Sequence, residues 1–237
     1  MAKTLLPEVR EHFSKSSEDY IAWRSWNLTN PELLKYGRVL EVGCGAKFSF
    51  ESTLPKYGID ITPILLQELK RKSPEVNVIM ADARFLPFRN SVFDTVGAVF
   101  VLHHLVGDTI AISKGNIRSS LSEMKRVLNA GGQILILEHL CKNKVFSLFF
   151  FTVTWFMAKL SINIKYLDIH DRVVTYFLDE KTFENICSHV GLKSGVVASE
   201  VWQFRRVLLG YDKQMLLKKK IEFWDPWIIG RDSFECS

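Results

Sequence analysis

Several common signatures are missing from this chain, and each absence excludes a class of protein. The four cysteines are far apart and form no Cys-x-x-Cys pair, so we expect neither a zinc site nor a disulfide framework. The first residues, Met1 to Thr4, do not resemble the start of a secretory signal. These absences predict a protein without a bound metal that works in a reduced, cytoplasmic compartment.

The sequence also has no internal repeat, no low-complexity stretch and no apolar run long enough for a transmembrane helix. Its most apolar segment, residues 145–158, contains 14 residues without a charge. A helix that crosses a bilayer needs about 20 such residues. The 237 residues, 47% of them hydrophobic, are enough for one α/β domain with a full core.

The chain has a modest excess of positive charge, which is compatible with several kinds of binding partner. The net charge is +5, from 31 basic and 26 acidic side chains, with short basic clusters at residues 70–72 and 218–220. Either cluster could contact phosphate, RNA or an acidic membrane, but runs this short are usually solvated helix ends. No segment resembles an RNA-binding module, so a nucleic-acid partner is the less favoured reading.

A glycine turn is the most informative feature that is present. Residues 39–45, Val-Leu-Glu-Val-Gly-Cys-Gly, predict a buried strand and a tight turn, followed by a helix and a second strand that ends at Asp60. Gly43 and Gly45 leave no side chain between the turn and a ligand. Asp60 offers two acceptor oxygens where ribose hydroxyls would lie. This order of parts predicts a site for a nucleoside-bearing cofactor at the edge of a parallel sheet.

The rest of the chain continues the alternation of strands and helices. Apolar runs predict strands, amphipathic segments predict helices, and the glycines at 131 and 132 suggest a left-handed helix stop. We expect strands at 76–83, 93–104, 133–138, 194–201 and 204–210, and helices at 117–128 and 182–190.

Together these motifs resemble the class I S-adenosylmethionine-dependent methyltransferases, in the small-molecule branch that includes ubiquinone and menaquinone methyltransferases. The resemblance covers residues 39–138 and is specific for the cofactor fold rather than for a substrate. It implies a Rossmann-like α/β fold with a seven-stranded, mostly parallel sheet, helices on both faces and an antiparallel last strand. The motifs that carry it are Glu41–Gly45, Asp60, Ala81–Ala83, Leu86–Phe88 with Phe93-Asp94, Leu102–Leu105, and Met124–Leu128 before Gly131-Gly132.

The resemblance assigns roles in binding S-adenosylmethionine. The glycine turn and its acid would frame the amino-acid part of the cofactor, the later acids would bind ribose and the adenine amino group, and apolar residues would pack on the adenine and near the sulfonium. An N-terminal tyrosine could close the pocket. The residues concerned are Glu41, Gly43, Gly45, Asp60, Ile61, Asp82, Ala83, Phe100 and Tyr20.

Two adjacent histidines are the candidate catalytic residues. His103 and His104 lie at the carboxyl end of the expected fourth strand, where ligands approach an open sheet, so either could act as a base if the acceptor must lose a proton. Ordinary burial or hydrogen bonding is the alternative explanation for them. A second polar cluster, Asp168–Arg172, could act similarly or could simply begin a helix.

Residues 145–158 have three interpretations: a helix buried in the core or in a dimer contact, a lid over a greasy substrate pocket, and a helix that lies in a membrane interface. The last two predict a small, apolar or lipid-like methyl acceptor and a possible peripheral membrane location. The oligomeric state cannot be read from the chain.

We expect a methyltransferase domain at 1–210, with N-terminal cap helices at 1–37 and an apolar substrate cover at 140–180. An aromatic tail at 211–237 would pack on the domain or on a partner. Two other functions stay open. The basic balance permits a tRNA-modifying methyltransferase. A non-catalytic cofactor-binding scaffold is permitted by Lys47, which stands where many relatives carry a glycine. A nicotinamide-dependent dehydrogenase is disfavoured because the chain lacks Gly-x-Gly-x-x-Gly.

Overall fold

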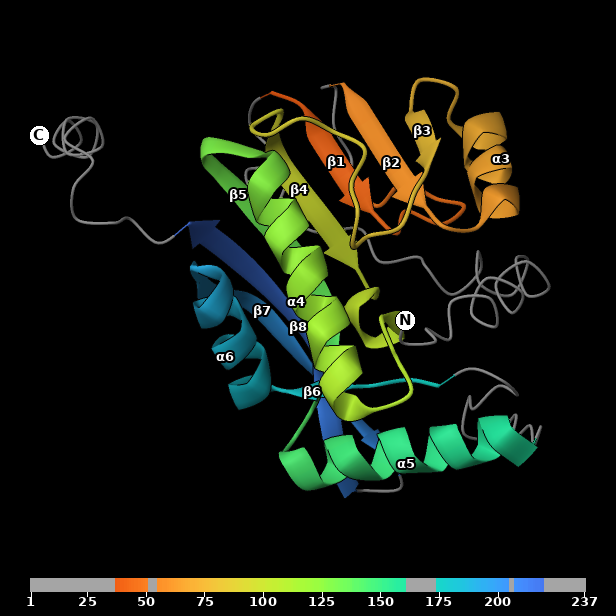
Figure 1. Ribbon diagram of the computed structural model, residues 1–237, viewed down its shortest axis with the longest axis vertical. Coiled ribbons are helices and arrows are strands. Elements are labelled where there is room, and N and C mark those ends of the chain that lie inside the picture. The colour runs from red at the N-terminus through yellow and green to blue at the C-terminus, as the bar shows by residue number, and fades with distance from the viewer. Residues whose placement is uncertain (1–36, 51–54, 161–173, 205–206, 220–237) are drawn as a thin grey trace, which may run out of the picture.

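The computed structural model describes residues 37–50, 55–160, 174–204 and 207–219, and these form a single eight-stranded sheet with helices packed on it (Figure 1). Side chains are described for most of this part, except along much of the last two strands. The strands are β1 (Val39–Val42), β2 (Lys56–Asp60), β3 (Asn77–Met80), β4 (Phe93–Val99), β5 (Leu128–Cys141), β6 (Leu178–Asp179), β7 (Leu192–Phe204) and β8 (Val207–Lys219). The helices are α3 (Pro63–Lys72), α4 (Ile110–Val127), α5 (Lys144–Leu160), α6 (Glu180–Val190) and the 3-10 turn η2 (Leu102–His104).

The strand order is β3-β2-β1-β4-β5-β8-β7, and the first five of these strands are parallel. β8, the last strand in the chain, pairs antiparallel with β5 and with β7. The predicted Rossmann-like α/β fold, with a mostly parallel sheet and an antiparallel last strand, is confirmed. From β1 the strand order proceeds toward one edge of the sheet, through β2 and β3, and from β4 it proceeds toward the other edge. A ligand crevice is expected at the carboxyl ends of β1 and β4, where this change occurs.

The sheet has eight strands rather than the predicted seven, because β5 is longer than the sequence indicated. β5 continues to Cys141, and the short β6 pairs with Leu140 and Cys141, which also pair with β8. β8 runs to Lys219, so residues 211–219 belong to the sheet, whereas the sequence assigned them to the C-terminal tail. The expected segments 1–36 and 220–237 lie outside the described residues.

Alternate residues of the central strands point to two different cores, as a sheet covered on both faces requires. Leu40 and Val42 of β1 join the large core beneath α4 and α6, while Val39 joins a second core around Phe50. Phe48 packs both on that second core and on the buried side chains of α3. Helices therefore cover both faces, as predicted.

α4 differs from the helix that the sequence predicted at 117–128, at both of its ends. It begins at Ile110, because the side chain of Thr109 accepts a hydrogen bond from the backbone N–H of Ile112 (3.2 Å) and caps the helix. It ends at Val127 without a glycine stop, since Leu128 already has extended angles and pairs with Phe93 of β4. Gly131 does adopt a positive φ of 78°, but within β5.

Two further expectations about local structure were wrong. The expected fourth strand, residues 93–104, stops at Val99, and its last residues form the turn η2. The helix expected between β1 and β2 does not occur in the described part of that connection, because residues 43–50 form turns and irregular structure. Both differences lie at the crevice between β1 and β4, where the chain must leave the sheet.

Candidate functional site

A pocket that opens to solvent lies at the carboxyl ends of β1, β2 and β4 and beyond the end of β3. Its walls are mostly apolar, and two aspartates interrupt them. This is the crevice that the strand order predicts as a ligand site. It is lined by Gly43, Ile59–Thr62, Leu65, Ala81–Ala83, Phe100, Val101, His104 and Leu105.

The glycine turn forms the floor of the pocket and is folded against β2. The backbone N–H groups of Gly43 and Cys44 both donate to the carbonyl oxygen of Ile59, at 2.8 and 3.0 Å. Gly43 and Gly45 have positive φ values of 69° and 57°, which L side chains rarely adopt. A Cβ atom on Gly43 would lie 2.5 Å from a methyl carbon of Val101 across the pocket floor. Both the backbone angle and the close approach therefore require glycine here.

We predict that Gly43→Ala lowers the free energy of unfolding by about 2 to 4 kcal/mol, from left-handed backbone strain together with the overlap with Val101. The second change in Gly43→Ala/Val101→Ala removes that overlap but leaves the strain. The double variant is therefore expected to be less destabilised than the sum of the two single variants. Urea unfolding of all four proteins measures this coupling, and simple additivity would contradict the overlap.

Asp60 holds the glycine turn at the end of β2 while it faces the pocket. One carboxylate oxygen accepts from the backbone N–H of Gly45 (2.9 Å), and the other accepts from that of Thr62 (2.8 Å). A carboxylate has about four acceptor positions and can accept from several donors at once. The structure thus places Asp60 where the sequence expected a ribose-binding acid.

Glu41 lies behind the glycine turn rather than in the pocket. Its side chain is fully buried, and one carboxylate oxygen accepts from the backbone N–H of Ser49 at 2.7 Å. The sequence grouped Glu41 with Gly43 and Gly45 as residues that frame a ligand, but of these three only Gly43 is among the pocket-lining residues. Glu41 instead ties residues 43–50 to β1 and so fixes the course of the loop.

Asp82 and Ala83 line the pocket beyond β3, as expected, and Asp82 is part of a charged pair. The guanidinium group of Arg84 forms an ion pair with the Asp82 carboxylate at 2.6 Å and also donates to Asn116 of α4 at 3.1 Å. These contacts anchor the loop after β3 to α4. Ile61 lines the same pocket from the opposite side of the β2 end.

Phe100 combines a strained backbone with a position in the pocket wall. Its φ is 54°, unusual for a residue other than glycine, and its backbone N–H donates to the carbonyl oxygen of Leu137 at 2.8 Å. Its ring stacks on that of His139, with 4.2 Å between the centroids and 15° between the planes. Strained backbone is often kept where it serves a site, and here it turns the chain from β4 into the pocket wall.

The structure separates the two adjacent histidines. His104 lines the pocket, whereas His103 is buried beneath it, and its Nδ1 contacts the carboxylate of Glu138 at 2.5 Å. An ionised carboxylate only accepts hydrogen bonds, so His103 Nδ1 is the donor in this pair. Of the two candidates, only His104 is placed to reach a ligand in this pocket.

Glu138 is a buried carboxylate that the sequence did not single out. It accepts from the backbone N–H groups of Leu102 (2.7 Å) and His139 (2.8 Å) in addition to His103. Burial alone would raise the pKa of Glu138, but the charges and hydrogen bonds of His103 and His139 outweigh this effect and lower the pKa below its ordinary value. The sequence could have pointed to Glu138, because it is an acidic residue at the last position of the largely apolar strand predicted at 133–138.

Aromatic rings continue from the pocket wall toward α5. Beyond the Phe100–His139 stack, the ring of Phe177 lies 5.8 Å from His139 and 5.1 Å from His103. The ring of Phe150, on α5, lies 5.7 Å from Phe177. We call Phe100, His103, His104, His139, Phe177 and Phe150 the ring cluster. It combines phenylalanine and imidazole rings, and two of its members, Phe100 and His104, also line the pocket.

Two predicted site elements, Tyr20 and the cluster Asp168–Arg172, lie outside the described residues. Within the described part, no group of three or more His, Cys, Asp and Glu side chains is arranged to hold a metal ion.

Comparison with known proteins shows what this chain is similar to. Residues 40–136 match the model of a family described as a methyltransferase domain. The fold is similar to that of the YcgJ protein of Bacillus subtilis, with a TM-score of 0.60 and 15% identity over 78% of this chain and 92% of that one. A SAM-dependent methyltransferase of Methanosarcina mazei gives a TM-score of 0.59 and 15% identity, over 81% and 99%.

Curated relatives agree with this fold. The chain is 33% identical to a phosphatidylethanolamine N-methyltransferase of Cereibacter sphaeroides, over 46% of this chain and 53% of the relative. It is 30% identical to a demethylmenaquinone methyltransferase of Renibacterium salmoninarum, over 43% and 40%. The chain thus spans about half the length of the curated relatives it matches. Residues 40–136 thus resemble a methyltransferase domain in sequence, and the fold is similar to that of a solved SAM-dependent methyltransferase.

Proposed function

We propose that the chain transfers a methyl group from S-adenosylmethionine to a small, apolar or lipid-like acceptor. One observation carries the proposal: the pocket at the ends of β1, β2 and β4 has Asp60 and Asp82 in apolar walls, and the ring cluster lies directly beside it. A nucleoside needs acceptors for its hydroxyl and amino groups and apolar walls for its base. The ring cluster then provides a surface for an apolar second substrate.

The pocket residues suit the parts of S-adenosylmethionine. Asp60 would accept hydrogen bonds from the ribose hydroxyls, and Ile61 and Ala83 would pack on the adenine. The carboxylate of Asp82 would accept from the adenine amino group. Gly43 and Gly45 leave the turn bare of side chains, so that the amino-acid part of the cofactor could lie against the main chain. When bound, the cofactor supplies an electrophilic methyl group on a sulfonium, with a neutral thioether as leaving group.

The protein's main contribution to this reaction is positioning. In-line transfer requires the acceptor atom close to the methyl carbon, and alignment of this kind can supply most of the rate enhancement. Phe100 and His104, both in the pocket wall, would orient the acceptor. If the acceptor must lose a proton, His104 is the candidate base, while His103 and Glu138 act as positioning residues that hold η2 against β5.

The class of acceptor follows from the rings beside the pocket. Stacked and edge-on rings favour flat or apolar groups over highly charged ones. Two of the relatives are named for lipid or quinone substrates, phosphatidylethanolamine in one case and demethylmenaquinone in the other. Both names are compatible with an apolar or lipid-like acceptor, and we extend only this apolar character of the acceptor to the present chain.

Incubation with S-adenosylmethionine that carries a tritiated methyl group tests the proposal. We expect label to enter the organic phase when a total lipid extract is supplied, and to remain at background with bulk tRNA. Asp60→Ala serves as the inactive control. Label in tRNA would favour an RNA-modifying enzyme instead. Absence of turnover on any acceptor, together with calorimetric binding of S-adenosylhomocysteine, would favour a cofactor-binding scaffold.

A further inference from the structure

The helix α5 differs from an ordinary surface helix because large apolar side chains cover its exposed side as well as part of its buried side. Its buried positions, 147, 151, 154 and 157, follow helical spacing but include a serine and a threonine. Its outward positions carry large apolar side chains that are between 51% and 74% exposed. These outer-face residues are Val145, Leu148, Phe149, Phe156 and Leu160. A surface helix normally places its apolar stripe toward the core.

Contacts of the buried side fix this orientation. The hydroxyl of Thr154 donates to the carbonyl oxygen of Phe150 (2.8 Å) and accepts from the backbone N–H of Thr175 (3.2 Å). The ring of Phe151 packs edge-on against Tyr176, with centroids 5.9 Å apart. Rotating the helix to bury its outer face would break the hydrogen bond between Thr154 and Thr175. The exposed phenylalanines are therefore a defined surface of the fold.

The charged side chains within residues 142–160 are all positive. Lys142 and Lys144 lie at its amino end and Lys159 lies at its carboxyl end, and residues 142–160 contain no aspartate or glutamate. The ammonium group of Lys159 lies 4.0 Å from the ring centroid of Trp155. An apolar strip with lysines at both ends and a tryptophan beside one of them is complementary to the acyl chains and anionic headgroups of a bilayer surface.

We propose that the outer face of α5 docks on the surface of a membrane that contains anionic lipid. With 17 residues the helix is about 25 Å long, and it would lie parallel to the membrane with its lysines reaching the headgroups. Among the described residues, no helix combines the length and apolar content required to cross a bilayer. The docked helix therefore rests on the membrane rather than in a transmembrane position.

Charge makes a second copy of the chain a poorer occupant of this face. If two α5 helices packed outer face to outer face, lysines would meet lysines at both ends, in parallel and in antiparallel arrangements alike. Nothing between residues 142 and 160 could neutralise them, because the segment has no acidic side chain. Lipid phosphates can do so, and this favours the membrane over a dimer.

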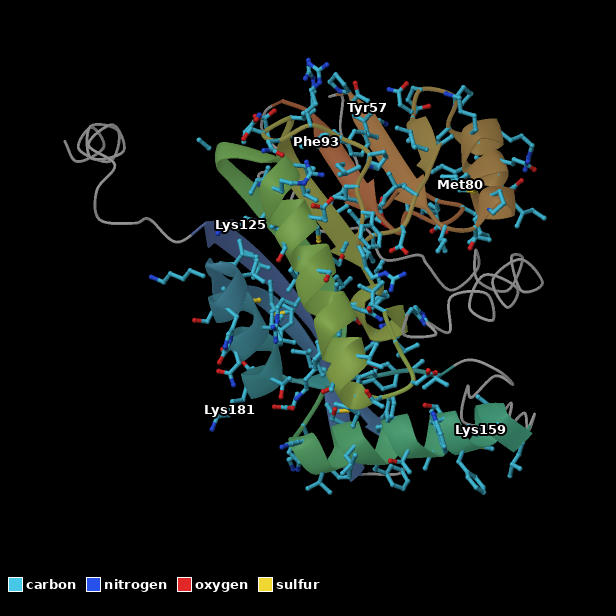
Figure 2. The ribbon with its side chains drawn as sticks, in the orientation of Figure 1. Tyr57, Met80, Phe93, Lys125, Lys159 and Lys181 are labelled. Atoms are coloured by element: carbon cyan, nitrogen blue, oxygen red, sulfur yellow. The ribbon has the colours of Figure 1, made fainter. Side chains whose placement is uncertain are left out.

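The position of α5 is suited to this role. In Figure 1 the helix runs along one end of the molecule, and Figure 2 shows side chains extending from its outer side, with Lys159 near its carboxyl end. Through Phe150 and Phe177 the same helix contacts the ring cluster beside the pocket. Docking goes beyond the proposed methyl transfer, since it requires neither a cofactor nor an acceptor.

Vesicle flotation of the full chain, without cofactor, tests the proposal. We expect the wild-type protein to float with vesicles of phosphatidylcholine and phosphatidylglycerol, and more weakly with phosphatidylcholine alone. Because each buried phenylalanine contributes about a tenfold factor in partitioning, Phe149→Ser/Phe156→Ser should lose about a hundredfold. Lys142→Gln/Lys144→Gln/Lys159→Gln should remove the preference for anionic vesicles.

A matched control comes from exposed apolar residues elsewhere in the fold. Met80 and Phe85 are 58% and 71% exposed but lie far from α5 in the chain, and Met80→Ser/Phe85→Ser should float like the wild type. Equal loss in both double variants would overturn the proposal, as would wild-type protein that does not float. The proposal would also be overturned if the wild type forms a dimer and does not float, and if Phe149→Ser/Phe156→Ser converts that dimer to a monomer. Methyl transfer to soluble acceptors is measured separately, so failure of docking leaves the proposed function intact.

Discussion

Asp60→Ala is expected to weaken binding of S-adenosylhomocysteine by about a hundredfold or more, because each charge-assisted hydrogen bond to a ribose hydroxyl contributes about 1.5 to 3 kcal/mol. The same change removes the acceptor for the backbone N–H groups of Gly45 and Thr62, so the glycine turn itself should loosen. Calorimetric titration gives the affinity. The ligand-induced rise in melting temperature gives an independent measure.

Asp94→Asn provides the control for this loss. Asp94 lies near the amino end of β4, at the opposite edge of the sheet from the pocket, where it accepts from the backbone N–H of Arg38 (2.8 Å) and from Asn129 (2.8 Å). The substitution should lower stability without changing affinity for the ligand. If Asp60→Ala binds S-adenosylhomocysteine as tightly as the wild type, the assignment of this pocket to the cofactor is wrong.

Glu138→Gln is expected to destabilise the fold by about 3 kcal/mol near neutral pH, although it preserves the shape of the side chain. Three N–H donors, those of Leu102, His139 and the His103 ring, converge on the two carboxylate oxygens. An amide has only one oxygen, so its NH2 group would face at least one of these donors in a buried site. Urea unfolding measures the loss.

The pH dependence of the same variant has a defined sign. The pKa of Glu138 in the folded protein lies below its ordinary value of 4.5. Its stabilising effect is therefore complete above pH 4.5 and is lost as the pH falls through the folded-state pKa. The difference in stability between wild type and Glu138→Gln should shrink in acid. Glu68→Gln, on the exposed surface of α3, should change stability little at any pH, and a constant Glu138 difference would contradict the assignment.

Short-range patterns were enough to predict the central strands and the residues that meet in the pocket at their ends. The apolar run at 39–42 became β1, and Asp60, Ile61, Asp82, Ala83 and Phe100 all reached one pocket. This worked because the carboxyl ends of adjacent parallel strands meet at one edge of the sheet, so that residues following different strands converge. The register between strands adds detail but does not change which residues meet.

Other parts depended on contacts that local patterns do not specify. α4 ends at Val127 because Leu128 pairs with Phe93, and a strand partner far away in the sequence overrode the glycine signal. The neighbours His103 and His104 differ because η2 turns one toward Glu138 of β5 and the other toward the pocket. Glu138 itself comes under η2 only because β4 and β5 are adjacent.

Residues 145–158 show the limit most clearly. The sequence excluded a membrane span by length, but almost every position is apolar, so periodicity could not indicate which face is buried. That choice was made by Thr154 and Phe151, through their contacts with Thr175 and Tyr176. The chain alone thus determined the mostly parallel framework and the residues at the pocket edge of the sheet, which depend on local order along the chain. The buried His103–Glu138 pair and the outward phenylalanines were decided by tertiary packing, because each depends on a partner that folding brings near.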